Sequence, residues 1–117
     1  MADIAKAALR NRVLEHLGVL GAGETAATAD ATLVDEAIDA CHERLQKFGL
    51  VPFATSAIPS WAQIHLRDYV AGDVAQVFGL GGARLAEFKE MQKRAEFELH
   101  RQLTGYKQPR RVVPEYF

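Results

Sequence analysis

The amino-acid sequence predicts an all-α protein: a four-helix antiparallel bundle with a non-helical C-terminal arm. Four segments repeat apolar residues at helical spacing, and glycines or prolines separate these segments. The 117 residues suffice for one domain with one core. Apolar residues make up 49% of the chain and charged residues 25%, which is a globular composition. We expect a helical domain over residues 1–105 and an extended arm over residues 106–117.

The first two helices are expected on either side of the linker "AGETAATAD". The first begins near Asp3, a common N-cap residue type, and ends near Leu20 before Gly21. The second runs to Phe48, where Gly49 stops it. Its apolar positions form one stripe, made of Val34, Ala37, Ile38, Cys41, Leu45 and Phe48. This stripe predicts that Cys41 is a core residue and not a nucleophile, and a single cysteine excludes an internal disulfide.

The segment "LVPFATSAIP" cannot be helical throughout, because Pro52 and Pro59 interrupt it. Its apolar residues predict burial on the domain or by a neighbouring chain, with a short strand as an alternative. The third helix is expected from Trp61, after Ser60 as N-cap, to about Phe78. Its broad apolar face is typical of the central helix of a small bundle.

The fourth helix is expected from about Ala83 to Leu103, with Gly105 ending it. Its inward positions are Leu85, Phe88, Met91, Ala95, Leu99 and Leu103. Phe97 lies about 180° from Phe88, because each helical residue turns the chain by about 100°. An aromatic side chain on this otherwise charged face indicates contact with another chain.

The net charge of −1 is unevenly distributed. Residues 1–83 contain six Lys/Arg and ten Asp/Glu, whereas residues 84–117 contain eight Lys/Arg and five Asp/Glu. Nucleic-acid binders are usually basic overall, so this pattern favours contacts between oppositely charged protein faces. A chance imbalance on a solvated surface is the alternative.

The residue pattern does not indicate catalysis or metal binding. Glu96 and His100 have a spacing that can hold a metal, but without a second such pair we interpret them as a solvated helix pair. "GLGGARL" lacks a preceding strand and the phosphate-loop lysine, so it indicates an interhelical turn. We expect no enzymatic activity, no cofactor, no metal and no small-molecule substrate. No apolar run reaches the roughly 20 residues of a membrane span, and the N-terminus lacks a signal-peptide core, so we expect the cytoplasm.

Three segments resemble the head-to-tail connector proteins of tailed bacteriophages, also called adaptor, head-completion or packaged-DNA-stabilisation proteins. They are "IAKAALRNRVLEHLGV", "TLVDEAIDACHERLQKFGL" and "IPSWAQIHLRDYVAGDVAQVFG". A long charged helix and a non-helical tail follow, as in that family. The resemblance implies a structural neck protein that forms a ring, typically of twelve copies, under the portal, connects capsid to tail and continues the DNA channel.

The resemblance also implies partners and a location. The partners are the portal protein, further copies of this chain and the next neck or tail protein, with non-specific contact to DNA in the channel as a further alternative. The implied location is the virion neck, after assembly in the host cytoplasm. A small helical DNA-binding or regulatory protein is the alternative function, which salt-dependent DNA binding would reveal.

The C-terminal arm is the predicted portal-binding element, because aromatic and valine side chains can anchor it and arginines can pair with acids on a partner. Its candidate residues are Tyr106, Lys107, Arg110, Arg111, Val112, Val113, Pro114, Tyr116 and Phe117. A closed ring requires two different faces of one subunit to meet. The candidate subunit contacts are Asp35, Asp39, Glu43, Phe53, Ile58, Lys93, Arg94 and Phe97.

Overall fold

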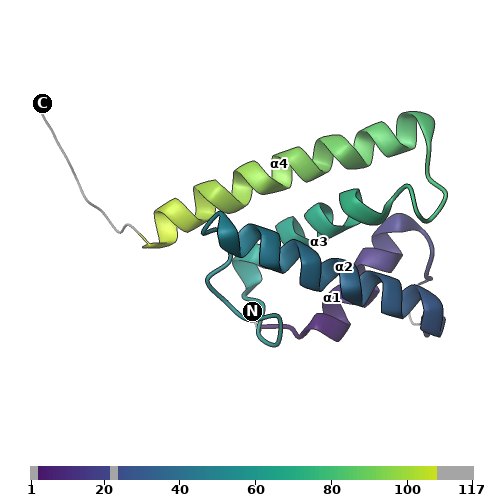
Figure 1. Ribbon diagram of the computed structural model, residues 1–117, viewed down its shortest axis with the longest axis horizontal. Helices are drawn as coiled ribbons and strands as arrows, with labels where there is room; N and C mark the ends of the chain where they lie inside the picture. The colour runs from purple at the N-terminus through teal and green to yellow at the C-terminus, as the bar shows by residue number, and fades with distance from the viewer. Residues whose placement is uncertain (1–2, 22–23, 108–117) are drawn as a thin grey trace, which may run out of the picture.

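The computed structural model describes residues 3–21 and 24–107, with side chains described up to residue 102. It contains four helices, α1 (Lys6–Leu17), α2 (Thr28–Lys47), α3 (Ser60–Val74) and α4 (Gly82–Lys107). Helices α2, α3 and α4 alternate in direction, and α1 lies against α2 and α3 (Figure 1). The predicted all-α, four-helix architecture is confirmed, and none of the described residues forms a strand.

Helix α3 is the centre of the bundle, as its broad apolar face predicted. It packs against each of the other three helices, whereas α4 packs its backbone only against α3. The two helices approach closely at Gly72, where an added Cβ would lie 2.5 Å from the Cβ of Gln92. Real Cβ atoms do not come this close to another carbon, so only glycine fits at this crossing.

The bounds of α1 differ from those expected. The helix begins at Lys6 and not at Asp3, because the backbone of Ile4 pairs with Ile58 in an isolated antiparallel bridge. It ends at Leu17, three residues before the expected end, because Gly18 adopts a left-handed φ of 81° and caps the helix. Glycine adopts this conformation without steric cost, which makes Gly18 the stop signal in place of Gly21.

The bounds of α3 and α4 also differ. Helix α3 ends at Val74 and not at the expected Phe78, because residues 75–79 form turns. Helix α4 continues through Gly105 to Lys107, so Tyr106 and Lys107 belong to the helix and not to an extended arm. One glycine inside a helix costs only about 1 kcal/mol, whereas a proline costs about 3 kcal/mol and also restricts the residue before it. Pro109 is therefore the stronger stop signal.

The loop between α2 and α3 is packed on the domain, as its apolar composition predicted. Leu50, Val51 and Ile58 are buried, and the strand alternative reduces to the single bridge with Ile4. The buried side chain of Gln63 completes this junction, because it donates a hydrogen bond to the carbonyl oxygen of Ile58 over 3.1 Å. The loop is therefore held by the N-terminal residues and by α3.

Candidate functional site

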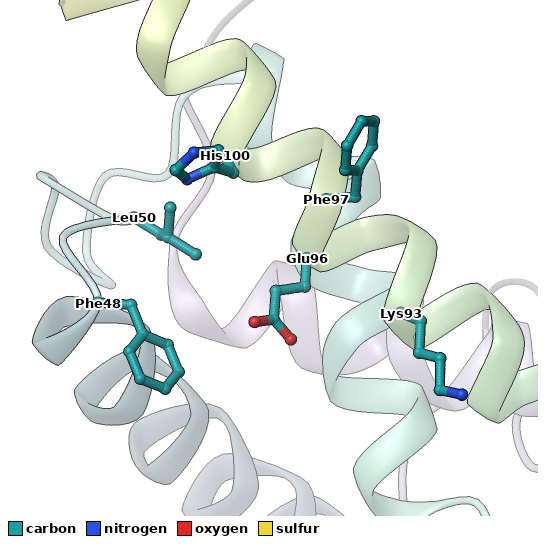
Figure 2. Close-up of a pocket in the computed structure, with 6 residues that line it drawn as sticks. All are labelled: Phe48, Leu50, Lys93, Glu96, Phe97 and His100. Atoms are coloured by element: carbon teal, nitrogen blue, oxygen red, sulfur yellow. The ribbon is translucent and has the colours of Figure 1, made fainter.

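A groove separates the C-terminal end of α2 from the second half of α4 (Figure 2). It is an open hollow of about 510 Å³, and its lining residues are Phe48, Leu50, Lys93, Glu96, Phe97 and His100. Both helices pack on α3, but their backbones do not pack on each other. A space lined by side chains therefore remains between the two helices. We call it the α2–α4 groove.

Aromatic side chains give the groove its apolar character. Phe48 is 59% exposed and Phe97 is 63% exposed, whereas Leu50 between the helices is only 4% exposed. Glu96 and His100 point from α4 toward Phe48 and Leu50 (Figure 2). An apolar surface of this kind, surrounded by charged side chains, is typical of a site that binds another polypeptide.

The exposure of Phe48 corrects the sequence prediction, which placed it in the core stripe of the second helix. Phe48 is the C-cap residue of α2, and the chain then turns at Gly49 with φ of 75°. Helix α4 packs on α3 and does not reach over this end of α2. Phe48 therefore continues the apolar stripe of α2, but it lies beyond the region where other helices cover that stripe.

A polar cluster centred on Asp73 lies beside the groove, and a smaller hollow next to it shares Lys93 and Glu96 with the groove. The carboxylate of Asp73 on α3 accepts hydrogen bonds from Arg44 over 2.8 Å and from Cys41 over 3.2 Å, both on α2. Its other oxygen accepts a hydrogen bond of 2.8 Å from Gln92 on α4. One carboxylate thus joins three helices.

The electrostatics of this cluster follow from burial and hydrogen bonding. Burial would raise the pKa of Asp73, but the hydrogen bonds from Gln92, Arg44 and Cys41 outweigh it, so the pKa lies below its ordinary value. Burial, with the charge of Asp73 beside it, raises the pKa of the Cys41 thiol to about 12. At neutral pH this thiol is protonated, buried and a poor nucleophile, in agreement with its predicted place in the core.

Two of the three acidic residues of α2 that were proposed as subunit contacts already form ion pairs within the chain, which the sequence did not predict. Asp35 forms an ion pair of 3.1 Å with Arg10, and Asp39 forms one of 3.2 Å with Lys6, both on α1. These pairs are partly or largely exposed, so they are weak contacts that nevertheless partly neutralise the acids. Glu43 is exposed on the same helix.

The two apolar loop residues proposed as subunit contacts lie in different environments. Phe53 is half-buried, and its ring meets Trp61 edge-on at a centroid distance of 5.7 Å. His42 also contacts Phe53, because its Nε2–H donates a hydrogen bond to the carbonyl oxygen of Phe53. Ile58 is fully buried within the chain. This corrects the expectation for Ile58, since a side chain without exposed surface cannot meet a neighbouring subunit.

The basic and aromatic candidates on α4 divide between two sides of that helix. Lys93 and Phe97 line the α2–α4 groove, whereas Arg94 lines a separate hollow of about 160 Å³ beside Ile64 and Glu98. Of the portal-binding candidates, Tyr106 and Lys107 contribute backbone to α4. The side chains of these two and all candidates from Arg110 onward lie outside the described residues.

The sequence did not indicate that Phe48, Leu50, Glu96 and His100 lie around one site. Two features of the sequence could have indicated it: Phe48 lies just before the glycine that ends the second helix, and Phe97 lies on the charged face of the fourth helix. Among the described residues, no three His, Cys, Asp or Glu side chains are grouped closely enough to hold a metal ion. No described helix combines the length and the apolar character needed to cross a membrane.

Comparisons of the chain with protein-family models, with curated proteins and with solved structures found no match.

Proposed function

We propose that this chain is a structural, non-enzymatic neck adaptor of a tailed phage or phage-derived particle. It would form a ring under the portal, connect capsid to tail and continue the DNA channel. The proposal is supported by the segments that resemble connector proteins, because residues 4–19 contain α1, residues 32–50 overlap α2 and residues 58–79 contain α3. The long charged helix that follows in the resemblance corresponds to α4.

The observation that carries the proposal is the pair of exposed aromatic rings, Phe48 and Phe97, on the two sides of the α2–α4 groove. A chain whose function required no partner would gain stability by covering these rings, because burial of an aromatic side chain is worth about 1.5–3 kcal/mol. An uncovered aromatic pair is the arrangement expected of a subunit that is completed by other proteins.

A second apolar surface favours a ring over an isolated pair of subunits. Ile64 on α3 is 58% exposed and lies beside Arg94 on the other side of α4 from the groove. Two different surfaces on one subunit allow each copy to bind the next in a head-to-tail manner. Such contacts form a closed ring when the rotation between neighbouring copies brings the last copy back to the first.

The direct test is electron microscopy of this protein co-purified with a portal protein encoded in the same genome. The proposal expects a second ring of density attached to the portal ring. A portal ring without added density, at protein concentrations well above micromolar, would contradict it. Micromolar or tighter DNA affinity that falls steeply with added salt would instead favour the DNA-binding alternative.

The role of the C-terminal arm in portal binding has its own test. Deletion of residues 108–117 should leave the helical circular-dichroism signal unchanged, because α4 and the buried core lie before this segment. Portal binding should be lost, since the deletion removes two arginines and four large apolar side chains. A full-length Val19→Ser variant is a matched control for loss of a partly exposed apolar side chain at another surface. Unchanged portal affinity after the deletion would refute this role.

A further inference from the structure

We propose that the isolated chain forms a two-fold symmetric dimer in which the outer faces of two α4 helices pack against each other in antiparallel orientation. Helix α4 is accessible for this contact, because it lies along one edge of the bundle and its backbone packs only against α3 (Figure 1). The inference does not rest on the neck-adaptor proposal, since it concerns the protein before any portal is present.

The outer face of α4 carries four exposed side chains at helical spacing. Glu90, Arg94, Phe97 and Arg101 follow one another at intervals of four, three and four residues. At about 100° per residue, these intervals place all four within an arc of about 60°. We call them the outer stripe. It lies on the side of the helix opposite to the buried positions, which include Phe88, Ala95 and Leu99.

The charges of the outer stripe are complementary to a second copy of the same stripe. Glu90 and Arg101 lie about 16 Å apart along the helix, at equal distances from the midpoint of the stripe. When two stripes meet in antiparallel orientation with their midpoints aligned, each Glu90 faces the partner's Arg101, and two ion pairs form. A parallel arrangement would instead place like charges opposite each other. The charges therefore favour the antiparallel dimer.

The contacts within the chain leave these side chains available to a partner. Among the described residues, Glu90 and Arg94 form no ion pair. Arg101 donates from Nε and Nη2 to one oxygen of Glu98, over 3.1 and 2.7 Å. Its side chain is nevertheless 62% exposed, and its Nη1 group is left to bond a second carboxylate. Dimer formation thus requires no internal ion pair to break.

The centre of the stripe supplies the apolar part of the contact. Phe97 is 63% exposed and lies about 2 Å from the midpoint along the helix axis. The two Phe97 rings of a dimer therefore lie about 4.5 Å apart along that axis, within reach of an aromatic pair. Arg94 lies at the height of the partner's Phe97, where its guanidinium can cover the ring. An aromatic centre between charged pairs is the expected composition of a small protein–protein contact.

This dimer has a consequence for the α2–α4 groove, because Phe97 also lines that groove. While a second copy covers Phe97, the ring is not available to a different protein. The dimer must then dissociate before Phe97 can contact a neighbour in a larger assembly. One pair of helices forms a small interface, so the dimer is expected to be weak and readily reversible.

The test is sedimentation equilibrium of the full chain without a portal, at concentrations up to about 1 mM, which detects even weak association. The unsubstituted protein should show a monomer–dimer equilibrium. Glu90→Arg and Arg101→Glu should each be monomeric alone, because two-fold symmetry brings like charges together twice in each variant. Both positions are exposed, so the helical circular-dichroism signal should be retained.

An equimolar mixture of these two charge variants tests the register directly. The mixture should form a heterodimer, because the introduced arginine faces the introduced glutamate and the native Arg101 of one chain faces the native Glu90 of the other. A mixture that stays monomeric would contradict the proposed register. A monomeric unsubstituted protein at every concentration would overturn the dimer itself.

Two further variants test the aromatic centre. Phe97→Ser should weaken dimerisation about tenfold or more, because the dimer loses this ring twice. Val77→Ser is the matched control, since Val77 is also 63% exposed but lies outside α4, and its dimerisation should be unchanged. Equal dimerisation of the two variants would exclude Phe97 from the contact. Trimers or larger species of the unsubstituted protein would indicate head-to-tail association and would overturn the two-fold contact.

Discussion

Asp73 on α3 and Arg44 on α2 form an ion pair of 2.8 Å beside the α2–α4 groove. The same carboxylate also accepts hydrogen bonds from Cys41 on α2 and Gln92 on α4. The backbones of α2 and α4 do not pack on each other. The half-buried carboxylate of Asp73 therefore connects the two helices, because it lies on α3 and bonds to side chains of both. We expect the hydrogen bonds of Asp73 to fix the distance between α2 and α4 on the two sides of the groove.

Replacement of Asp73 by asparagine should destabilise the fold by about 1–3 kcal/mol, because Arg44 loses its charged partner and one amide cannot satisfy all three donors. Urea unfolding monitored by circular dichroism measures this free energy. Asp39→Asn is the matched control, since the Asp39 side chain is 58% exposed and its pair with Lys6 should be worth less than about 1 kcal/mol. Equal losses in the two variants would contradict the role of Asp73.

His16 should make stability depend on pH near neutrality. Burial and the charges of Arg67 and Arg84 lower the pKa of His16 from 6.5, although the carboxylate of Asp68 lies 3.3 Å away and acts in the opposite direction. Asp68 is already paired with Arg67 at 2.8 Å, which weakens its effect. The unfolded chain therefore binds a proton at higher pH than the folded chain, and stability falls as the pH drops below about 6.5.

The measurement for His16 is the urea midpoint of the protein between pH 7.5 and pH 5, compared with a His16→Gln variant. The variant should lose less stability over this range, because it has no proton to take up on unfolding at that position. A direct NMR titration of the His16 ring should give a pKa below 6.5. Identical pH profiles for the two proteins would show that His16 is not responsible.

Gly72 should be intolerant of any side chain. Gly72→Ala places a Cβ 2.5 Å from the Cβ of Gln92, so α4 must move away from α3. We expect a loss of about 1–3 kcal/mol from overpacking, although alanine is intrinsically better in a helix by about 1 kcal/mol. Gly81→Ala has open space around it and should be close to neutral. Thermal unfolding of both variants distinguishes them, and a neutral Gly72→Ala would mean that the helices do not cross this closely.

Cys41 should react with thiol reagents only when the protein opens. Its side chain is fully buried, and its pKa of about 12 keeps it protonated at pH 8. The labelling rate with a chromogenic disulfide should be negligible under native conditions and should rise in proportion to the unfolded fraction as urea is added. Rapid stoichiometric labelling of the native protein would instead place the thiol at the surface.

Much of the fold can be read from local pattern. The stripe that contains Val34, Ile38, Cys41 and Leu45 is buried, and so are Phe88, Ala95 and Leu99 on α4. Helical periodicity is set by residues three and four positions apart, so the sequence is sufficient to predict it. The exposure of Phe97 was also predictable, since its position lies opposite Phe88 on the same helix.

The tertiary structure alone decided the features that depend on which helices touch. Phe48 continues the stripe of α2 but is exposed, because α4 packs on α3 and leaves this end uncovered. Asp35 and Asp39 were candidate contacts with a neighbouring subunit, but they form ion pairs with α1 of the same chain. Glu96 shares a groove with Phe48 although 48 residues separate them in the chain. Periodicity states which side of a helix is apolar, whereas the identity of the neighbour that covers it is a property of three-dimensional packing.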